Sequence, residues 1–204
     1  MKNTIRLIVV GAPKSGKTKL IETINKKLNY KLIHKGSEVA RNIWARYHTQ
    51  SIDEIRLDTE KINTIQWEIL KTELEKQQEQ TESFISDAGW GNIVYMARFC
   101  TCYGDALQSE EWKVLMDIAH DPTTINIWCR PNKMFLDIQD STDINRAKGD
   151  TSWDSMIEFD AILGALIQQY KIPVLNLHMP TMVERVNQVI YVIDKLKYGL
   201  DIQK

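Results

Sequence analysis

The sequence predicts an α/β fold, a three-layer sandwich in which a five-stranded parallel sheet carries helices on both faces. Short apolar runs rich in β-branched residues alternate with longer segments whose apolar residues recur at helical spacing, which is typical of parallel sheets with helical crossovers. A glycine-rich loop also joins the first apolar run to the first helical segment. The runs expected to form strands are residues 5–10, 30–34, 83–86, 124–129 and 174–177.

The glycine-rich loop is the most specific functional pattern in the chain. It fits G-x-x-x-x-G-K-[ST] with Gly11, Ala12, Pro13, Lys14, Ser15, Gly16, Lys17 and Thr18. The glycines let the backbone turn tightly and direct its N–H groups inward, and the following helix presents its positive end to the same point. Such a loop binds the phosphates of ATP, with Lys17 reaching the β and γ phosphates and the Thr18 hydroxyl binding Mg²⁺. Because strand, loop and helix agree, we predict a P-loop NTPase fold rather than a chance match at a lysine-rich helix start.

A helix is predicted after the second strand, with Ser37 as its N-cap and Trp44 near its end. Glu38 and Arg41 lie three residues apart on one face of this helix, just beyond the carboxyl end of a strand. Ligands bind at that edge of open α/β sheets, so the pair is a candidate for substrate binding. An exposed ion pair is the alternative on spacing alone.

One or two long amphipathic helices are predicted between Ser51 and Gln80, because apolar residues recur there at roughly helical intervals among many charges. Trp67 belongs to this apolar stripe. Its indole could stack on a flat substrate, although a tryptophan on such a stripe more often packs in the core. Both interpretations stay open.

An aspartate, Asp87, ends the third apolar run, and Gly89 follows two residues later. An acid at the carboxyl end of a strand, in a chain with a phosphate loop, is placed to hold Mg²⁺ through water or to accept a proton from an attacking hydroxyl. The alternative is an N-cap for a helix from Trp90 onward. The position after a strand favours the functional role, so Asp87 is the predicted catalytic carboxylate and metal ligand.

The second half of the chain alternates helices and strands. The first of its helices carries Arg98, a further candidate for substrate binding, and Gly104 is expected to end that helix. Apolar residues between positions 93 and 99 mark this helix, and further helices are predicted at residues 110–120, 153–170 and 179–196.

The polar segment 132–150 is expected to be a lid, because it lacks a long apolar period and is too long for a simple connection. A lid must bring a cation to the transferring phosphoryl group, since negative charge spreads over its oxygens in the transition state. The candidates are Arg146, the predicted catalytic cation, Lys148, and Arg130 after the fourth strand. Solvated charges are an equal alternative for the lid residues.

Composition limits the function classes. The formal net charge of -1 gives no general attraction to nucleic acid. Cys100, Cys102 and Cys129 match neither a zinc spacing nor a disulfide framework, and the four histidines show no paired metal spacing. There is no signal-peptide pattern, and no apolar stretch approaches the roughly 20 residues that span a bilayer. We therefore expect one domain over residues 1–204, in the cytoplasm.

Four stretches resemble the P-loop kinases of the nucleoside and nucleotide kinase group, in particular the ribosylnicotinamide kinase domain of the bacterial NAD-biosynthesis regulator. They are the phosphate loop, Glu38-x-x-Arg41, Phe84-Ile85-Ser86-Asp87, and the tail from Tyr170-Lys171-Ile172-Pro173-Val174-Leu175-Asn176-Leu177 into Glu184-Arg185-Val186-Asn187-Gln188-Val189. The resemblance implies that Lys17 and Thr18 bind ATP and Mg²⁺. It also implies that Asp87 lies near the acceptor hydroxyl, with Glu38 and Arg41 beside the acceptor.

The predicted function is an ATP-dependent kinase that moves the γ-phosphoryl group to a hydroxyl of a nucleoside-like or nucleotide-like acceptor. Two departures from the family leave the acceptor open: Asp87-Ala88-Gly89 stands where many relatives have Asp-Arg-Gly, and no D-G-x-R follows the acidic pair Asp137 and Asp140. One alternative is a kinase for a hydroxymethylated pyrimidine in phage DNA, where some of the six tryptophans could stack on an extruded base. A second is an NTP-driven switch or ATPase that couples hydrolysis to a partner. The oligomeric state stays open.

Overall fold

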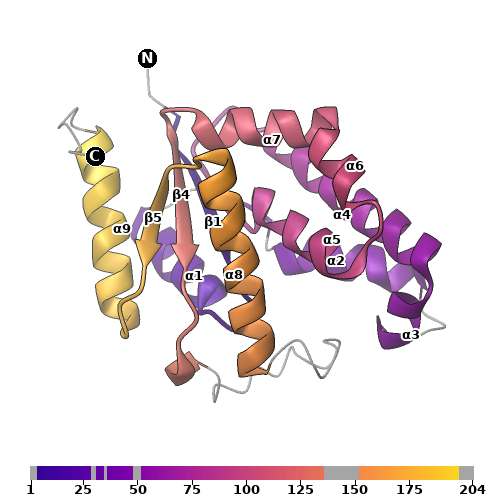
Figure 1. The fold of residues 1–204 in the computed structure, drawn as a ribbon. Helices are drawn as coiled ribbons and strands as arrows, with labels where there is room; N and C mark the ends of the chain where they lie inside the picture. Colours follow the sequence, from indigo (N-terminus) through magenta and orange to yellow (C-terminus); the bar gives the residue numbers. More distant parts are fainter. Residues whose placement is uncertain (1–3, 29–30, 35, 48–51, 136–151, 198–204) are drawn as a thin grey trace.

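The computed structural model describes residues 4–28, 31–34, 36–47, 52–135 and 152–197, and Figure 1 shows how their helices and strands are arranged. Within these residues, five strands form one parallel sheet in the order β2-β3-β1-β4-β5. The predicted α/β fold with a parallel sheet is confirmed. The strands are β1 (Arg6–Gly11), β2 (Lys31–His34), β3 (Phe84–Asp87), β4 (Thr124–Cys129) and β5 (Val174–Leu177).

Strand β1 lies in the middle of the sheet, between β3 and β4. Val9 pairs with Asp87 of β3, and Gly11 pairs with Cys129 of β4. Because the strands run in one direction, their carboxyl ends meet at one edge, which points downward in Figure 1. The residues that follow β1, β3 and β4 are therefore neighbours, and this is the edge at which open α/β sheets bind ligands.

Helices connect the strands, and several begin at a residue whose side chain accepts a hydrogen bond from the N–H three positions on. Asp58, Ser109 and Ser152 cap α4, α7 and α8 in this way. The described helices are α1 (Lys17–Leu28), α2 (Gly36–Trp44), α3 (Ile52–Leu57), α4 (Thr59–Gln78), α5 (Ile93–Phe99), α6 (Tyr103–Gln108), α7 (Glu110–His120), α8 (Trp153–Tyr170) and α9 (Met182–Lys197), with single 3₁₀ turns η1 (Ala45–Tyr47), η2 (Gly89–Asn92) and η3 (Lys133–Phe135).

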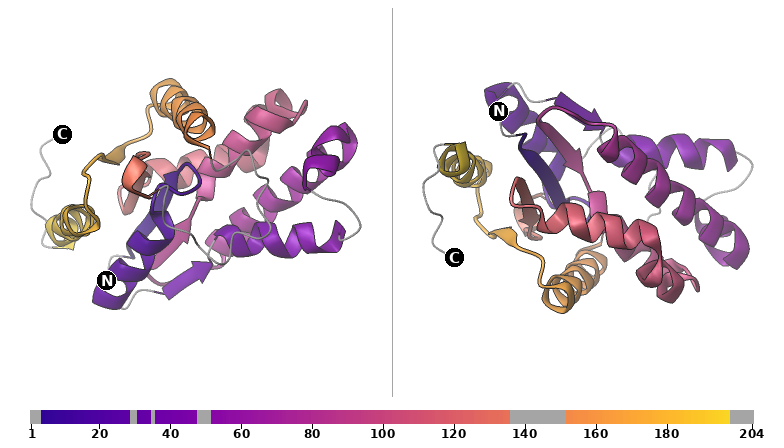
Figure 2. Two further views of the ribbon diagram at one scale, coloured as in Figure 1. Left: turned by 90° about the horizontal axis from the view of Figure 1, so that it is seen from below. Right: turned by 90° about the horizontal axis from the view of Figure 1, so that it is seen from above.

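The helices cover the sheet in two layers, as Figure 2 shows. On one face, strand residues such as Val9 and Ile127 pack against α1 and α9. On the other face, residues such as Val10 and Phe84 pack against α4, α5, α7 and α8. The alternation follows from strand geometry, since successive side chains point to opposite faces. A smaller apolar cluster joins α2 and α3 to α4.

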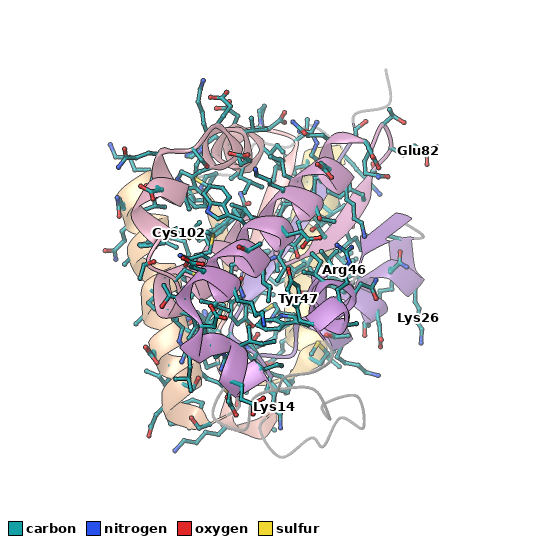
Figure 3. The ribbon with its side chains drawn as sticks, turned by 90° about the vertical axis from the view of Figure 1, so that its right-hand side faces the viewer. Lys14, Lys26, Arg46, Tyr47, Glu82 and Cys102 are labelled. Carbon is teal, nitrogen blue, oxygen red and sulfur yellow. The ribbon has the colours of Figure 1, made fainter. Side chains whose placement is uncertain are left out.

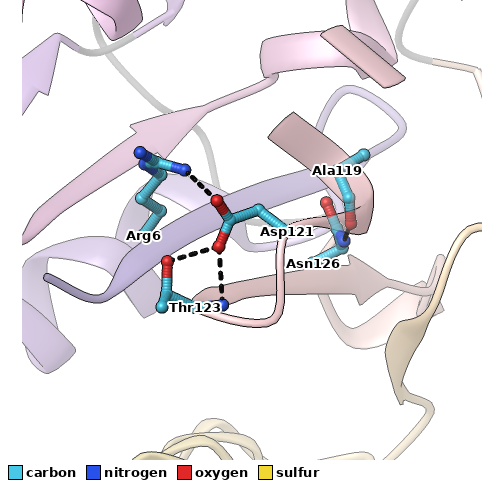
Figure 4. Close-up of polar contacts among 5 residues, drawn as sticks. All are labelled: Arg6, Ala119, Asp121, Thr123 and Asn126. Carbon is cyan, nitrogen blue, oxygen red and sulfur yellow. Dashed lines mark hydrogen bonds and ion pairs between the residues drawn. The ribbon is translucent and has the colours of Figure 1, made fainter. Parts of the chain in front are cut away.

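Polar contacts close the opposite edge of the sheet, where β1 and β4 begin (Figure 4). Arg6 Nη1 donates to Asp121 Oδ2 at 2.9 Å, and Asp121 Oδ1 accepts from the backbone N–H and the hydroxyl of Thr123 at 2.8 and 2.6 Å. Within β4, the side-chain amide of Asn126 donates to the carbonyl oxygen of Ala119 at 2.7 Å. These contacts tie the turn between α7 and β4 to β1.

One predicted helix boundary is wrong. Gly104 lies inside α6 and does not end the helix that carries Arg98, because α5 already ends at Phe99. The extended backbone of Cys100 turns the chain there, and Gly104 falls in the first turn of the next helix. The break in α5 therefore occurs four residues before Gly104 and does not depend on a glycine.

The segment predicted as a lid falls mainly on residues 136–151, which lie outside the described part of the chain. Its first residues are described and include η3. No helix among the described residues has the length and apolarity to cross a bilayer.

Candidate active site

The phosphate loop, residues 11–18, leaves β1 and enters α1 at the carboxyl edge of the sheet. Its backbone has positive φ at Gly11 (153°), Lys14 (57°) and Gly16 (88°), which lets the chain curl within a few residues. Figure 3 shows Lys14 at this end of the molecule and Glu82, just before β3, toward the other. Because α1 begins at Lys17, the N–H groups of the loop lie at the positive end of that helix. This geometry suits an anion.

Lys17 folds its side chain back over the loop. Its Nζ donates hydrogen bonds to the carbonyl oxygens of Gly11 and Ala12, at 2.8 and 2.9 Å. A compact ammonium held in this way adds a point charge to the ring of N–H groups. Thr18 follows it, half-buried on the first turn of α1. The predicted phosphate-binding and metal-binding side chains therefore start from the same helical turn.

Asp87 lies at the end of β3 and is only 4% exposed. The pKa of the Cys129 thiol, at the end of β4, depends on the charges around it. Burial raises the pKa of Cys129 to about 12, while the charge of Lys17 opposes the shift and the charge of Asp87 adds to it. Both charged groups therefore act on one thiol at the carboxyl edge of the sheet. The strand register agrees, since Asp87 pairs with Val9, two residues before the phosphate loop, so Lys17 and Asp87 lie at the same edge of the sheet.

The turn after Asp87 is strained. Ala88 has φ 90° and ψ -54°, a backbone conformation that residues other than glycine rarely adopt. Its N–H donates to the carbonyl oxygen of Val9 at 2.7 Å, and its own carbonyl oxygen accepts from the N–H of Gly91 at 2.7 Å. These two bonds hold the turn against β1. Strain of this kind is concentrated at functional sites, where the surrounding structure maintains it.

Glu73 of α4 is a second buried acid, and sequence reasoning missed it. It is 1% exposed, and its carboxylate accepts a hydrogen bond from the side-chain amide of Asn92, in the turn after β3. Burial raises the pKa of Glu73 well above its usual value, and the negative charge of Asp87 raises it further. A signal was present in the sequence, since Gln66, Glu73 and Gln77 share one buried face of α4 at helical spacing.

Arg130, a candidate cation for the transferring phosphoryl group, forms an ion pair with Asp160 of α8. Its Nε and Nη2 each lie 2.8 Å from Asp160 Oδ2, and Trp128 Nε1 donates to the other oxygen of that carboxylate at 2.9 Å. The guanidinium carbon lies 4.2 Å from the centroid of the Trp128 ring. Burial raises the pKa of Asp160, and the charge of Arg130 opposes this shift. These contacts hold Arg130 on the α8 side of the sheet.

Trp67 and Arg98 each contact other parts of the fold. Trp67 is half-buried against the apolar cluster of α5, α7 and α8, and it stands six residues from Glu73, about a third of a turn around α4. The structure therefore does not place Trp67 on the face of α4 that lies near Asp87. Arg98 Nη2 donates to Ser155 Oγ at 3.0 Å and to Glu158 Oε2 at 2.9 Å, which ties α5 to the first turns of α8.

The remaining predicted site residues lie outside what the structure describes. Arg146 is among residues 136–151, together with Lys148 and the acidic pair of the predicted lid. Glu38 and Arg41 belong to α2, whose backbone is described, but their side chains are outside the described part.

The oxygen atoms at the site fit Mg²⁺. Thr18 offers a hydroxyl and Asp87 a carboxylate, and Mg²⁺ prefers oxygen ligands while keeping several waters and binding substrate phosphates. Within the described ranges, no cluster of three or more His, Cys, Asp or Glu side chains could hold a metal by itself. The donor set therefore suits an ion that is shared with a nucleotide rather than one caged by protein.

Arg185 of α9 is the second residue that sequence reasoning missed. It is 1% exposed, and its Nη1 donates to the carbonyl oxygen of Ser15 in the phosphate loop at 2.9 Å. The sequence held one indication of this burial, because Arg185 directly precedes the apolar stripe of α9 that includes Val186 and Val189.

The family profile described as an AAA domain, AAA_28, matches residues 6–185, from the start of β1 into α9. The chain belongs to this family. No curated protein matches it by sequence. The match includes the phosphate loop, Asp87 and Arg185, so the site described above lies entirely within the AAA domain.

Solved structures share the fold of this AAA domain. NadR protein in complex with NR has a TM-score of 0.68 at 15% identity, over 99% of this chain and 54% of that chain. Deoxyadenosine kinase from M. mycoides with bound dCTP has a TM-score of 0.58 at 11% identity, over 94% and 100%. Shikimate kinase from Acinetobacter baumannii in complex with shikimate has a TM-score of 0.57 at 11% identity, over 99% and 97%. The chain spans about half the length of NadR, and the predicted P-loop kinase fold is confirmed.

Proposed function

We propose that this AAA domain is an ATP-dependent kinase that transfers the γ-phosphoryl group of ATP to a hydroxyl of a nucleoside-like or nucleotide-like acceptor. The observation that carries the proposal is the placement of a phosphate loop and a buried aspartate at neighbouring strand ends. Asp87 pairs in register with Val9, two residues before the loop, and Lys17 and Asp87 both influence the thiol of Cys129. A kinase needs a triphosphate site and an acid for the acceptor at one edge.

The groups of the site divide the work of the reaction in this proposal. The loop N–H groups and Lys17 hold the triphosphate and balance the charge that develops on the γ-phosphoryl oxygens. Asp87 orients the acceptor hydroxyl and takes its proton as the new oxygen–phosphorus bond forms and the bond to the β-γ bridging oxygen breaks. Thr18, with Asp87 through water, would hold Mg²⁺, which when bound neutralises charge on the β and γ phosphates.

The acceptor class draws on the structural relatives. One of them is a deoxyadenosine kinase and another holds NR, whereas the third holds shikimate, which is not a nucleoside. Their names support a small hydroxyl-bearing acceptor, and two of these three favour one of the nucleoside kind. At such low sequence identity, the structural likeness supports the fold but does not identify the acceptor. The experiment below is therefore what identifies it.

The DNA alternative depended on tryptophans that could stack on an extruded base. All six tryptophans are among the described residues, and each is buried or half-buried. No exposed indole therefore supports base stacking in this part of the chain. Hydroxymethylated DNA accordingly enters the experiment as one acceptor among several.

The test is transfer of label from [γ-³²P]ATP to a panel of nucleosides, nucleotides, shikimate and hydroxymethylated DNA. We expect label on a free nucleoside or nucleotide, and a loss of roughly 10²–10⁴-fold for Asp87→Asn, because a general base contributes about that much. Asp121→Asn is the matched control, since this carboxylate lies at the opposite edge of the sheet (Figure 4). Label in DNA alone would reassign the acceptor. Partner-stimulated ATP hydrolysis without a labelled acceptor would contradict the kinase proposal.

A further inference from the structure

Arg185 joins three loops at the carboxyl edge of the sheet. Its Nε donates to the carbonyl oxygen of Met179 after β5, at 2.8 Å. Its Nη1 donates to the carbonyl oxygen of Ser15 in the phosphate loop at 2.9 Å, and its Nη2 to that of Arg130 after β4 at 3.1 Å. All three acceptors are backbone atoms, so the fork of the guanidinium fixes the relative position of these loops.

The guanidinium of Arg185 is sealed from solvent. The ring of Phe135 covers it, with 4.8 Å between the guanidinium carbon and the ring centroid. The same ring reaches the loop, because a Cβ built on Gly16 would lie 3.4 Å from Phe135 Cδ2. Burial lowers the pKa of Arg185, but an arginine guanidinium does not lose its proton inside proteins. A full positive charge is therefore buried directly behind the phosphate loop.

This charge is balanced by peptide dipoles rather than by an acid. Among the residues that the structure describes, no carboxylate forms an ion pair with Arg185. A buried cation without a counter-charge is unfavourable, and an anion bound nearby relieves that penalty. The bond to the Ser15 carbonyl also polarises the peptide between Ser15 and Gly16, whose N–H belongs to the loop that presents donors to phosphate.

We propose that Arg185 is a positioning residue for the triphosphate. It holds the peptide between Ser15 and Gly16 with its N–H toward the phosphates, and it adds buried positive charge that attracts a bound polyphosphate. It acts through the loop and does not touch the nucleotide. The inference deepens the proposed function, because it rests on the loop as a triphosphate site, and it makes α9 part of that site.

Equilibrium titration with the ATP analogue AMP-PNP, in parallel with AMP, tests the role of Arg185. For Arg185→Met we expect a loss of roughly 10–100-fold in AMP-PNP affinity, as for removal of a charge-assisted hydrogen bond, with AMP affinity unchanged. Arg185→Lys keeps the charge but loses the fork, so a several-fold loss is expected. Arg6→Met is the matched control, because Arg6 of β1 also holds a neighbouring turn, the one between α7 and β4, but at the far edge of the sheet (Figure 4). It should lower the melting temperature and leave AMP-PNP affinity as in the wild type.

Equal losses for AMP-PNP and AMP, or no loss for either, would overturn the inference and reduce Arg185 to a packing residue. If Arg185→Met does not fold, Arg185→Lys becomes the test. Wild-type AMP-PNP affinity in the Arg185→Lys variant would then overturn the inference, because the fork of the guanidinium would not matter for binding. The outcome is distinguishable from failure of the proposed function. A wild-type protein that binds AMP-PNP but phosphorylates no acceptor contradicts the kinase proposal, while a selective loss in the Arg185 variants still supports the inference.

Discussion

The carbonyl oxygen of Cys129 approaches the α-carbon of Gly11 so closely that a Cβ built on Gly11 would lie 2.4 Å from it. The two residues pair at the ends of β4 and β1, and Gly11 has φ 153°. The obstructing atom belongs to a central strand and cannot swing aside as a side chain could. Packing against β4, and not only the turn of the loop, therefore requires glycine at this position.

Gly11→Ala is expected to displace the start of the phosphate loop, because β4 cannot yield. We predict a loss of at least about tenfold in AMP-PNP affinity, together with a lower free energy of unfolding. Gly104→Ala is the control. Nothing lies within 4 Å of a Cβ at Gly104 in α6, so its affinity should be unchanged and its stability equal or higher by up to about 1 kcal/mol. Wild-type nucleotide binding by the Gly11 variant would contradict this account.

Lys17→Met is expected to lower phosphoryl transfer by about 10³-fold or more, because the proposed function assigns Lys17 the point charge that balances the developing negative charge of the γ-phosphoryl group. Lys26, exposed toward the end of α1, provides the matched control as Lys26→Met (Figure 3). Rates under saturating ATP separate turnover from binding. Near-normal transfer by the Lys17 variant would mean that the loop does not hold the transferred group.

Glu73 should make the folded state less stable as the pH rises. Its pKa is raised by burial first and by the charge of Asp87 second, so the folded chain keeps a proton that the unfolded chain releases above about pH 4.3. The free energy of unfolding therefore falls from that pH up to the folded-state pKa. Glu73→Gln removes this dependence and keeps an oxygen for Asn92. The melting temperature of the variant relative to wild type should rise between pH 4.5 and pH 8, and a constant difference would refute the assignment.

Asp121 should behave in the opposite sense. The hydroxyl of Thr123 lowers its pKa most, and Arg6 lowers it further, so the folded chain holds the carboxylate ionised where the unfolded chain begins to take up a proton. Its contribution is present above about pH 3.9 and is lost as the pH falls through the folded-state pKa. Because the pair is partly exposed, we expect Asp121→Asn to lose under about 1 kcal/mol at pH 7 and less than that at pH 3. Denaturant titrations at both pH values measure this.

The features that depend on neighbouring residues, the phosphate loop and the alternation of strands and helices, could be predicted from the sequence. The phosphate loop is contiguous, and its glycines, lysine and threonine are specified by the geometry of one turn, so Lys17 and Thr18 could be singled out directly from the sequence, while their roles toward ATP and Mg²⁺ stay predictions. The alternation of short apolar runs with helical periods likewise predicted the parallel α/β fold. Asp87 was singled out because a strand end and an acid coincide, although its role stays a prediction.

Contacts between distant segments were not predictable in this way. Arg185 is 170 residues from Ser15, and its burial depends on how α9 returns to the loop. Glu73 sits on a long helix whose orientation decides which polar residues face inward, so its burial follows from tertiary packing. The end of α5 was misplaced at Gly104 because an extended residue, Cys100, breaks that helix without any glycine or proline signal.

The carboxylate of Asp160 accepts hydrogen bonds from both Trp128 and Arg130, so its removal should destabilise the fold. Asp160→Ala leaves the indole N–H without its acceptor and the guanidinium without its counter-charge, so the free energy of unfolding should fall by about 2–4 kcal/mol. Asp160→Asn keeps an acceptor for Trp128 and should lose about half as much.

A double-mutant cycle of Asp160→Asn with Arg130→Met, followed by urea unfolding, isolates the ion pair from the indole bond. We expect a coupling energy of about 1–2 kcal/mol, since the carboxylate is buried while the guanidinium is partly exposed and can still reach water. Coupling near zero would show that Arg130 is not held by Asp160 in solution. The guanidinium would then be free to reach a bound triphosphate, and Arg130→Met should lower phosphoryl transfer instead of stability.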